Sequence, residues 1–373
     1  MHHAGKKVLS FLRNAVKTLR LALPKLGVGW MFAILTIDFN RIAIVELGIA
    51  AVLITAMLSL HYFLSPFQVI SGRFADKHPI FGLRRTPYLL IGGFVGSLIF
   101  VALPRIVHAV ADGSAWAIVS GFLLLVVYGI AIAFMGDAHH SLIAEVTEPR
   151  ARGGVISVVW TFTILSSIIS AIVFNIVSPE YSLAAMQRLY NLTPFVVVIS
   201  ILVGTLGIEK RLKGDQLKSA LEQSRKAAPE GNAIQAAINI LRNNRQARGF
   251  FIFVFVAIFS IFLQDNILEV FGAEVFKLSI EETRQFQPMW GGGVLVGMLL
   301  MGMASTVFGF SKRTITIVGC VGTAVGMAVL AMAALTRQVG IVFPALVMMG
   351  LFTGFFNVGA LSMMMDMTVE GAT

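Results

Sequence analysis

Ionisable side chains stand inside long apolar stretches of this sequence, and each is a candidate for chemistry. Asp38 and Arg41 are three residues apart in the first stretch, on one face of the expected helix, so they can neutralise each other. Such groups are costly in an apolar environment and often mark function there. The pair fits a proton or substrate relay, and equally a structural pair that fixes the helix. Further polar candidates are Asn40, Glu46, Asp137, His140, Glu145, Asp265 and Asp366.

A charged signature follows the second apolar stretch. Its glycine permits close helix packing, its aspartate is expected at the start of the next helical segment, where the helix dipole favours an anion, and its arginines can clamp carboxylates. The order resembles the loop signature of the major facilitator superfamily, G-x-x-x-D-R/K-x-G-R-R/K, with three extra residues. The resemblance implies a latch. We call Gly72, Asp76, Lys77, Gly82, Arg84 and Arg85 the latch signature.

The fourth apolar stretch ends in Asp137, His140 and Glu145. Asp137 and His140 share a helical face, but a metal site needs three or four converging ligands. We therefore expect no metal, and ionic contacts with Arg84, Arg85 and the arginines after Glu145. No phosphate loop, nucleophile–base arrangement or zinc spacing is present, so the sequence does not favour an enzyme.

The composition identifies the elements that must position these residues. Hydrophobic residues make up 57% of the 373, charged residues only 13%, and the mean hydropathy is +0.84. A soluble globular protein would have about a quarter charged residues, whereas helices of about 20 apolar residues cross a bilayer. Cys320, the single cysteine, excludes a disulfide framework. We expect spans near residues 26–46, 49–70, 87–104, 115–136, 155–177, 194–208, 248–264, 288–308, 314–335 and 339–364.

Charge predicts the orientation. Assigning the N-terminus and alternate loops to one side places 23 of the 29 Lys and Arg there, so that side should be cytoplasmic. Basic loops and anionic lipid headgroups account for the net charge of +10 without nucleic acid. No cleavable signal peptide is visible in the first 25 residues. An acidic group from Asp265 to Glu282 is expected in a solvated exterior loop.

The chain divides around one long polar segment. We expect a basic cytoplasmic arm over 1–25, a six-helix half over 26–208, a linker over 209–247 and a four-helix half over 248–373. Within the linker, 233–241 is expected to form either a surface helix or a solvated linker. A shift of 221 residues pairs Gly129 with Gly350 and Glu145 with Asp366, which suggests related halves. The second half would then lack two of twelve helices, through an incomplete chain or a natural short form. Glycines four apart, such as Gly293 and Gly297, suit close helix packing.

Three longer segments narrow the resemblance. Residues 40–48, 61–68 and 76–88, with 136–140 and 144–153, are similar to the PucC/LhaA group, the bacteriochlorophyll delivery family of the superfamily. The likeness is strong over the first 210 residues and weak thereafter. It implies an integral membrane protein of a phototrophic bacterium, in its inner, intracytoplasmic or thylakoid membrane. The implied partners are light-harvesting antenna polypeptides or other chlorophyll-binding proteins.

With that resemblance, His61 becomes a candidate pigment ligand. It lies near the middle of the second span, where a neutral imidazole could bind the magnesium of chlorophyll or bacteriochlorophyll. Tyr62 and Phe67 could pack on the macrocycle. The alternative is a histidine that hydrogen-bonds a neighbouring helix.

The sequence thus predicts an all-α polytopic membrane protein with the major facilitator architecture. We expect an assembly factor for light-harvesting complexes that delivers or holds pigment. The alternatives are a proton-coupled secondary transporter of a small molecule such as a tetrapyrrole, and a scaffold that binds antenna helices without carrying pigment. Sparse polarity in the middle of the spans favours the pigment hypothesis over a carrier of hydrophilic solutes.

Overall fold

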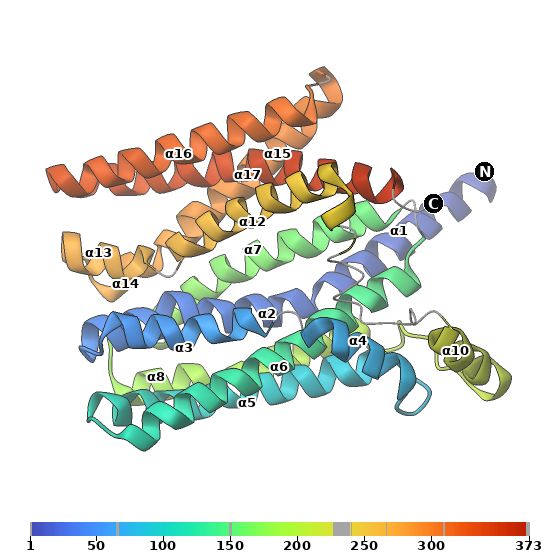
Figure 1. The fold of residues 1–373 in the computed structure, drawn as a ribbon, viewed down its shortest axis with the longest axis horizontal. Coiled ribbons are helices and arrows are strands. Elements are labelled where there is room, and N and C mark those ends of the chain that lie inside the picture. The colour runs from blue at the N-terminus through green and yellow to red at the C-terminus, as the bar shows by residue number, and fades with distance from the viewer. Residues whose placement is uncertain are drawn as a thin grey trace. The chain divides into compact units, whose positions relative to one another are not determined.

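The structure is a computed structural model that describes residues 2–64, 67–148, 151–226, 239, 241–265, 267–308 and 310–370. The described chain is built almost entirely of helices (Figure 1). By contacts it divides into two compact units. Unit 1 comprises Met1–Leu35, Ile42–Ser166 and Tyr181–Phe251, and unit 2 comprises Thr36–Arg41, Ser167–Glu180 and Ile252–Thr373. The predicted borders at 25, 208 and 247 stay a prediction.

The helices before the polar segment are α1 (His2–Ala22), α2 (Pro24–Ala33), the π-helical segments η1 (Ile34–Phe39) and η2 (Ile42–Glu46), α3 (Ala51–Phe63), α4 (Phe67–Lys77), α5 (Thr86–Ala111), α6 (Ala115–Val146), α7 (Arg152–Val177), α8 (Leu183–Asn191) and α9 (Thr193–Thr205). The remaining helices are α10 (Gly214–Lys226), α12 (Arg245–Asp265), α13 (Leu268–Phe276), α14 (Ile280–Arg284), α15 (Phe286–Phe308), α16 (Lys312–Thr336) and α17 (Val339–Glu370).

All ten predicted spans coincide with helix in the described residues. The helical residues of the second span belong to α3 and α4, on either side of residues 65 and 66, which lie outside the described chain. Seven helical stretches of the described residues are long and apolar enough to cross a membrane. They are Leu12–Glu46, Thr86–Ala111, Ala115–Val146, Gly154–Val177, Leu183–Thr205, Lys312–Thr336 and Val339–Ala360. The chain is an integral membrane protein. The predicted surface helix at 233–241 falls almost wholly outside the described residues.

In unit 1, small residues and side-chain hydrogen bonds hold the helices together. Ser166 donates a hydrogen bond to the Leu26 carbonyl at 2.6 Å, and a Cβ on Gly29 would lie 2.6 Å from the Ser166 Cβ. At the end of α1, Lys17 donates to the Val146 carbonyl of α6, and Arg20 donates to the Val203 carbonyl of α9 at 3.0 Å. Carbonyls at helix C-termini lack partners within their own helix, so cations satisfy them well. The predicted basic arm is therefore helical, and its end is attached to α6 and α9.

Unit 2 is held together by glycine-mediated helix contacts and a small apolar core. α17 packs along both α15 and α16 (Figure 1). A Cβ on Gly297 of α15 would lie 2.1 Å from the Leu351 carbonyl oxygen, and one on Gly350 of α17 would lie equally close to the Trp290 carbonyl oxygen. The expected close packing at these glycines is confirmed.

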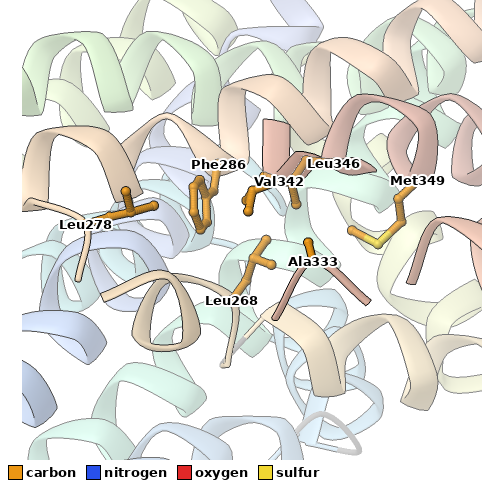
Figure 2. Close-up of a cluster of buried hydrophobic side chains, with 7 residues drawn as sticks. All are labelled: Leu268, Leu278, Phe286, Ala333, Val342, Leu346 and Met349. Carbon is orange, nitrogen blue, oxygen red and sulfur yellow. The ribbon is translucent and has the colours of Figure 1, made fainter. Parts of the chain in front are cut away.

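The apolar core of unit 2 lies between the chain from α13 to the start of α15 and the helices α16 and α17. Figure 2 shows the Phe286 ring pointing into the same space as Leu278, Val342 and Leu346. Phe286 and Leu346 are fully buried. This packing fixes the short segment from Leu278 to Phe286, which carries the fully buried Arg284.

Candidate functional site

The latch signature forms a compact charged cluster within unit 1. Asp76 lies at the end of α4, Arg85 immediately before α5, and Glu145 in the last turn of α6. Arg85 Nε donates to Glu145 Oε1 at 2.9 Å, its Nη2 pairs with Asp76, and Arg84 Nη2 lies 3.2 Å from Glu145 Oε1. The predicted contact of Glu145 with Arg84 and Arg85 is confirmed. The cluster joins the ends of three helices, so it can hold this edge of unit 1 rigid.

The expected helix-dipole role of Asp76 is wrong, because Asp76 lies at the C-terminal end of α4. Glu209, which follows α9, takes that role at the N-terminus of α5. Its Oε1 accepts hydrogen bonds from the backbone N–H groups of Arg84 and Arg85, at 2.6 and 2.9 Å, and its Oε2 accepts one from Thr86 at 2.7 Å. The first N–H groups of a helix have no partner within the helix, and their dipole favours an anion. Glu209 thus fixes the loop that carries both arginines.

The electrostatics of the cluster centre on Arg85, whose side chain is only 7% exposed. Burial by itself would lower the pKa of the Arg85 guanidinium, but the carboxylates of Glu145 and Asp76 outweigh burial and raise that pKa above its usual value. Asp137 adds a further negative charge. A Cβ on Gly72 would lie 2.7 Å from Asp137 Oδ1, so the lack of a side chain at Gly72 leaves room for this carboxylate against α4. Lys77 is exposed, and Gly82 has a φ of +76° in the loop.

The remaining polar candidates near this cluster do not join it. His140 is exposed, whereas the neighbouring His139 is buried and its Nε2 lies 2.7 Å from the Leu21 carbonyl oxygen. Arg152 contacts the Ala144 carbonyl, and Arg150 lies outside the described residues. Asp265 and Asp366 belong to α12 and α17, but their side chains lie outside what the structure describes.

A second charged site, within unit 2, overturns the predicted partner of Asp38. Asp38 pairs with Arg284, and both side chains have an exposed fraction of 0%. Arg284 Nε donates to Asp38 Oδ1 at 3.1 Å, and Nη2 contacts the same oxygen. Arg41 instead donates to the Leu278 carbonyl at 3.3 Å. The spacing rule for a regular α-helix failed here because Asp38 lies in the π-helix η1, whose wider turn changes which residues share a face.

Around this pair the expected solvated loop is largely ordered helix. Residues 268–276 and 280–284 form α13 and α14, and Glu269 is fully buried. Ser279 and Glu282 form a reciprocal capping box at the start of α14. Asn40 is buried beside Arg41 in the sequence, and Glu46 ends η2 as an exposed residue. The sequence did not single out Arg284, which stands there as a lone cation between the capping-box residues and Phe286.

His61 lies on α3 against α6 in unit 1. The centroid of its ring is 3.9 Å from that of Tyr62 and 5.4 Å from that of Tyr128. A Cβ on Gly129 would lie 3.0 Å from the His61 Cα, so the two helices touch at this level. His61 Nδ1 is buried beside the Leu58 carbonyl, without reaching hydrogen-bond geometry to any described residue. The imidazole packs against two phenol rings, but its Nδ1 makes no hydrogen bond to a described residue, and a neutral imidazole is able to coordinate a metal centre.

Phe67 is not grouped with His61. It contacts Phe134 of α6 at 6.0 Å between ring centroids, and Phe134 in turn lies against Phe74 and Tyr88. Phe67 therefore belongs to an aromatic cluster between α4, α5 and α6. The aromatic residues around the His61 ring are Tyr62 and Tyr128, and the sequence did not single out Tyr128.

Comparison with known proteins identifies the family. The profile of a protein family described as PUCC protein matches residues 38–373. The chain belongs to the PUCC protein family. A relative named bacteriochlorophyll synthase 44.5 kDa chain, from Rhodobacter capsulatus, is 29% identical over 366 residues, which cover 94% of this chain and 79% of the relative. Protein PucC of Rhodobacter capsulatus is 24% identical over 349 residues, which cover 87% of this chain and 70% of the relative.

Solved structures show the fold of this PUCC family member. The xylose transporter XylE from E. coli, in a partially occluded inward open conformation, matches with a TM-score of 0.65 and 17% identity, over 93% of this chain and 83% of that one. A D-xylose-proton symporter matches with a TM-score of 0.62 and 16% identity, over 92% and 80%. The predicted all-α major facilitator fold is confirmed. At these identities the likeness carries nothing about substrate.

Proposed function

We propose that this chain is an assembly factor for chlorophyll- or bacteriochlorophyll-binding light-harvesting complexes and holds the pigment during assembly. Its membership in the PUCC family and the name of its relative, a bacteriochlorophyll synthase chain, support a role in handling this pigment. In this proposal the chain has no catalytic activity of its own. Its partners are antenna polypeptides, or other chlorophyll-binding proteins, in the same membrane.

His61 is the observation that carries the pigment hypothesis. An imidazole nitrogen can coordinate the central magnesium of a chlorophyll as an axial ligand. Two phenol rings, those of Tyr62 and Tyr128, lie within 5.4 Å of the imidazole by ring centroids, and the next residue, Phe63, is 79% exposed. An apolar macrocycle lying over α3 would find an aromatic surface beside its ligand. We therefore assign His61 as the ligand and Tyr62 as its packing partner.

The test compares pigment and antenna content in a phototrophic host that lacks its own copy of the gene. The host receives wild type, His61→Leu, or the control His78→Leu, which removes an exposed histidine outside the proposed site. Each protein is purified gently, and pigment absorbance is measured per protein. We expect His61→Leu to lose most of the bound pigment, and His78→Leu to keep the wild-type amount.

The outcomes separate the hypotheses. Equal pigment on wild type and His61→Leu would remove His61 as the ligand. Normal antenna absorbance in the host without the gene would overturn the assembly role. If His61→Leu loses pigment but still restores the antenna, the chain acts as a scaffold in assembly and pigment binding is a separate property.

A further inference from the structure

Arg284 is the largest fully buried side chain in the described structure, and it contacts chain segments that are far apart in the sequence. Besides Asp38, its Nη1 donates to the Phe174 carbonyl and to Asn175 Oδ1, each at 3.3 Å, and to the Ser178 carbonyl. One guanidinium therefore connects α14 to the π-helical segment η1 and to the C-terminal end of α7.

The same contacts explain why unit 2 includes two short segments from the first half of the chain. Thr36–Arg41 and Ser167–Glu180 are short pieces of the first 180 residues, yet they pack with Ile252–Thr373. Asp38 belongs to the first piece, and Phe174, Asn175 and Ser178 belong to the second. Every polar partner of the Arg284 guanidinium thus lies in one of the two pieces that join the C-terminal residues.

We propose that Arg284 is a releasable clasp, which holds Thr36–Arg41 and Ser167–Glu180 on the C-terminal unit and lets them go together when the Asp38 pair breaks. The ion pair has a geometry that suits release. Both Arg284 Nε and Nη2 contact the single oxygen Oδ1, while the buried Oδ2 of Asp38 has no hydrogen-bond partner among the described residues. A two-oxygen fork would be the stronger arrangement.

Two general properties indicate that the Asp38–Arg284 ion pair can open and close, in preference to a permanent contact. A buried ion pair gains little over apolar packing because desolvation offsets its attraction, yet removing one partner leaves a costly unpaired charge. π-helical turns such as η1, which holds Asp38, are frequent at functional sites. The closed clasp is therefore sensitive to loss of either charge without being strongly stabilising itself.

The experiment measures the accessibility of Ser178, whose side chain is 1% exposed and whose carbonyl, retained in any variant, is the Arg284 acceptor. In a Cys320→Ser background, Ser178→Cys is labelled with a maleimide reagent in detergent, with and without Arg284→Gln. Ser71→Cys, fully buried in unit 1, reports on the rest of the fold. Glu274→Gln removes the exposed partner of Lys277 and serves as the control for loss of an ion pair in the same unit.

We expect Arg284→Gln to speed labelling of Ser178→Cys at least tenfold. Arg284→Lys keeps the positive charge but lacks the several N–H donors of the guanidinium, so its effect should be intermediate. Labelling of Ser71→Cys should stay slow throughout, and Glu274→Gln should change nothing. An unchanged rate at Ser178→Cys in Arg284→Gln would overturn the clasp. Equal acceleration at Ser178→Cys and Ser71→Cys would also overturn it, since Arg284 would then support the whole fold.

Discussion

Glu209 is the clearest example of one side chain that positions a functional loop. Its two carboxylate oxygens accept three backbone hydrogen bonds at the start of α5, from the N–H groups of Arg84, Arg85 and Thr86. The backbone N–H of Leu212 also donates to the Gly82 carbonyl at 2.9 Å. The residues after α9 are therefore bound to the latch signature at two points.

We predict that Glu209→Ala destabilises unit 1 by about 0.5–2 kcal/mol, the usual effect of losing an N-terminal helix cap. Glu209→Gln keeps one acceptor oxygen and should lose less. The measurement is the thermal unfolding midpoint in detergent, with the exposed Glu222→Ala as control. A midpoint that falls no further for Glu209→Ala than for Glu222→Ala would contradict the capping role.

At the scale of elements, α15 and α17 show how small residues set the spacing of two helices. Gly293 and Gly297 face Gly350 and Gly354, and a Cβ at any of the four would lie 2.1–2.5 Å from a backbone carbonyl oxygen of the opposite helix. Real side chains do not approach so closely, and backbone cannot move aside as a flexible side chain can. The pair of helices therefore depends on all four positions being glycine.

We predict that Gly297→Ala pushes α15 and α17 apart and destabilises unit 2 by about 1–3 kcal/mol, the typical effect of overpacking. Gly292→Ala, five residues earlier on the same helix, has open space around its Cβ and is the matched control. Thermal unfolding of both variants in detergent makes the comparison. Equal midpoints for the two alanine variants would show that the close approach is not rigid.

At the scale of the whole molecule, the distribution of charge predicts how the protein sits in the membrane. The N-terminus and alternate loops hold most Lys and Arg, which predicts that these parts face the cytoplasm. Residue 216, after α9, should then lie on the cytoplasmic side of the membrane, and residue 338, between α16 and α17, on the opposite side.

We predict that, in a Cys320→Ser background, Gln216→Cys reacts with a membrane-impermeant maleimide only after the cells are permeabilised. Gln338→Cys should react in intact cells, because the loop that contains it is expected outside. Both residues are exposed glutamines, so the substitutions leave the charge distribution unchanged. The reverse labelling pattern would refute a cytoplasmic N-terminus.

Local patterns in the sequence were enough to predict the fold class and most of the architecture. Apolar length and composition determined a polytopic helical protein, because a bilayer imposes the same length on every spanning helix. The latch signature and the segments around His61 indicated the superfamily and the family. Glycine spacing indicated close packing, since that constraint repeats along one helix and needs no knowledge of the partner.

Tertiary structure alone decided the partners. Asp38 was predicted to pair with Arg41, three residues away, but pairs with Arg284, because a π-helical turn redirects it and only the fold brings α14 to it. Glu209 reaches the start of α5 across more than 120 residues of sequence. Local spacing determines which face of a helix a side chain occupies, whereas the identity of the group it meets depends on how distant segments pack, and no local pattern contains that information.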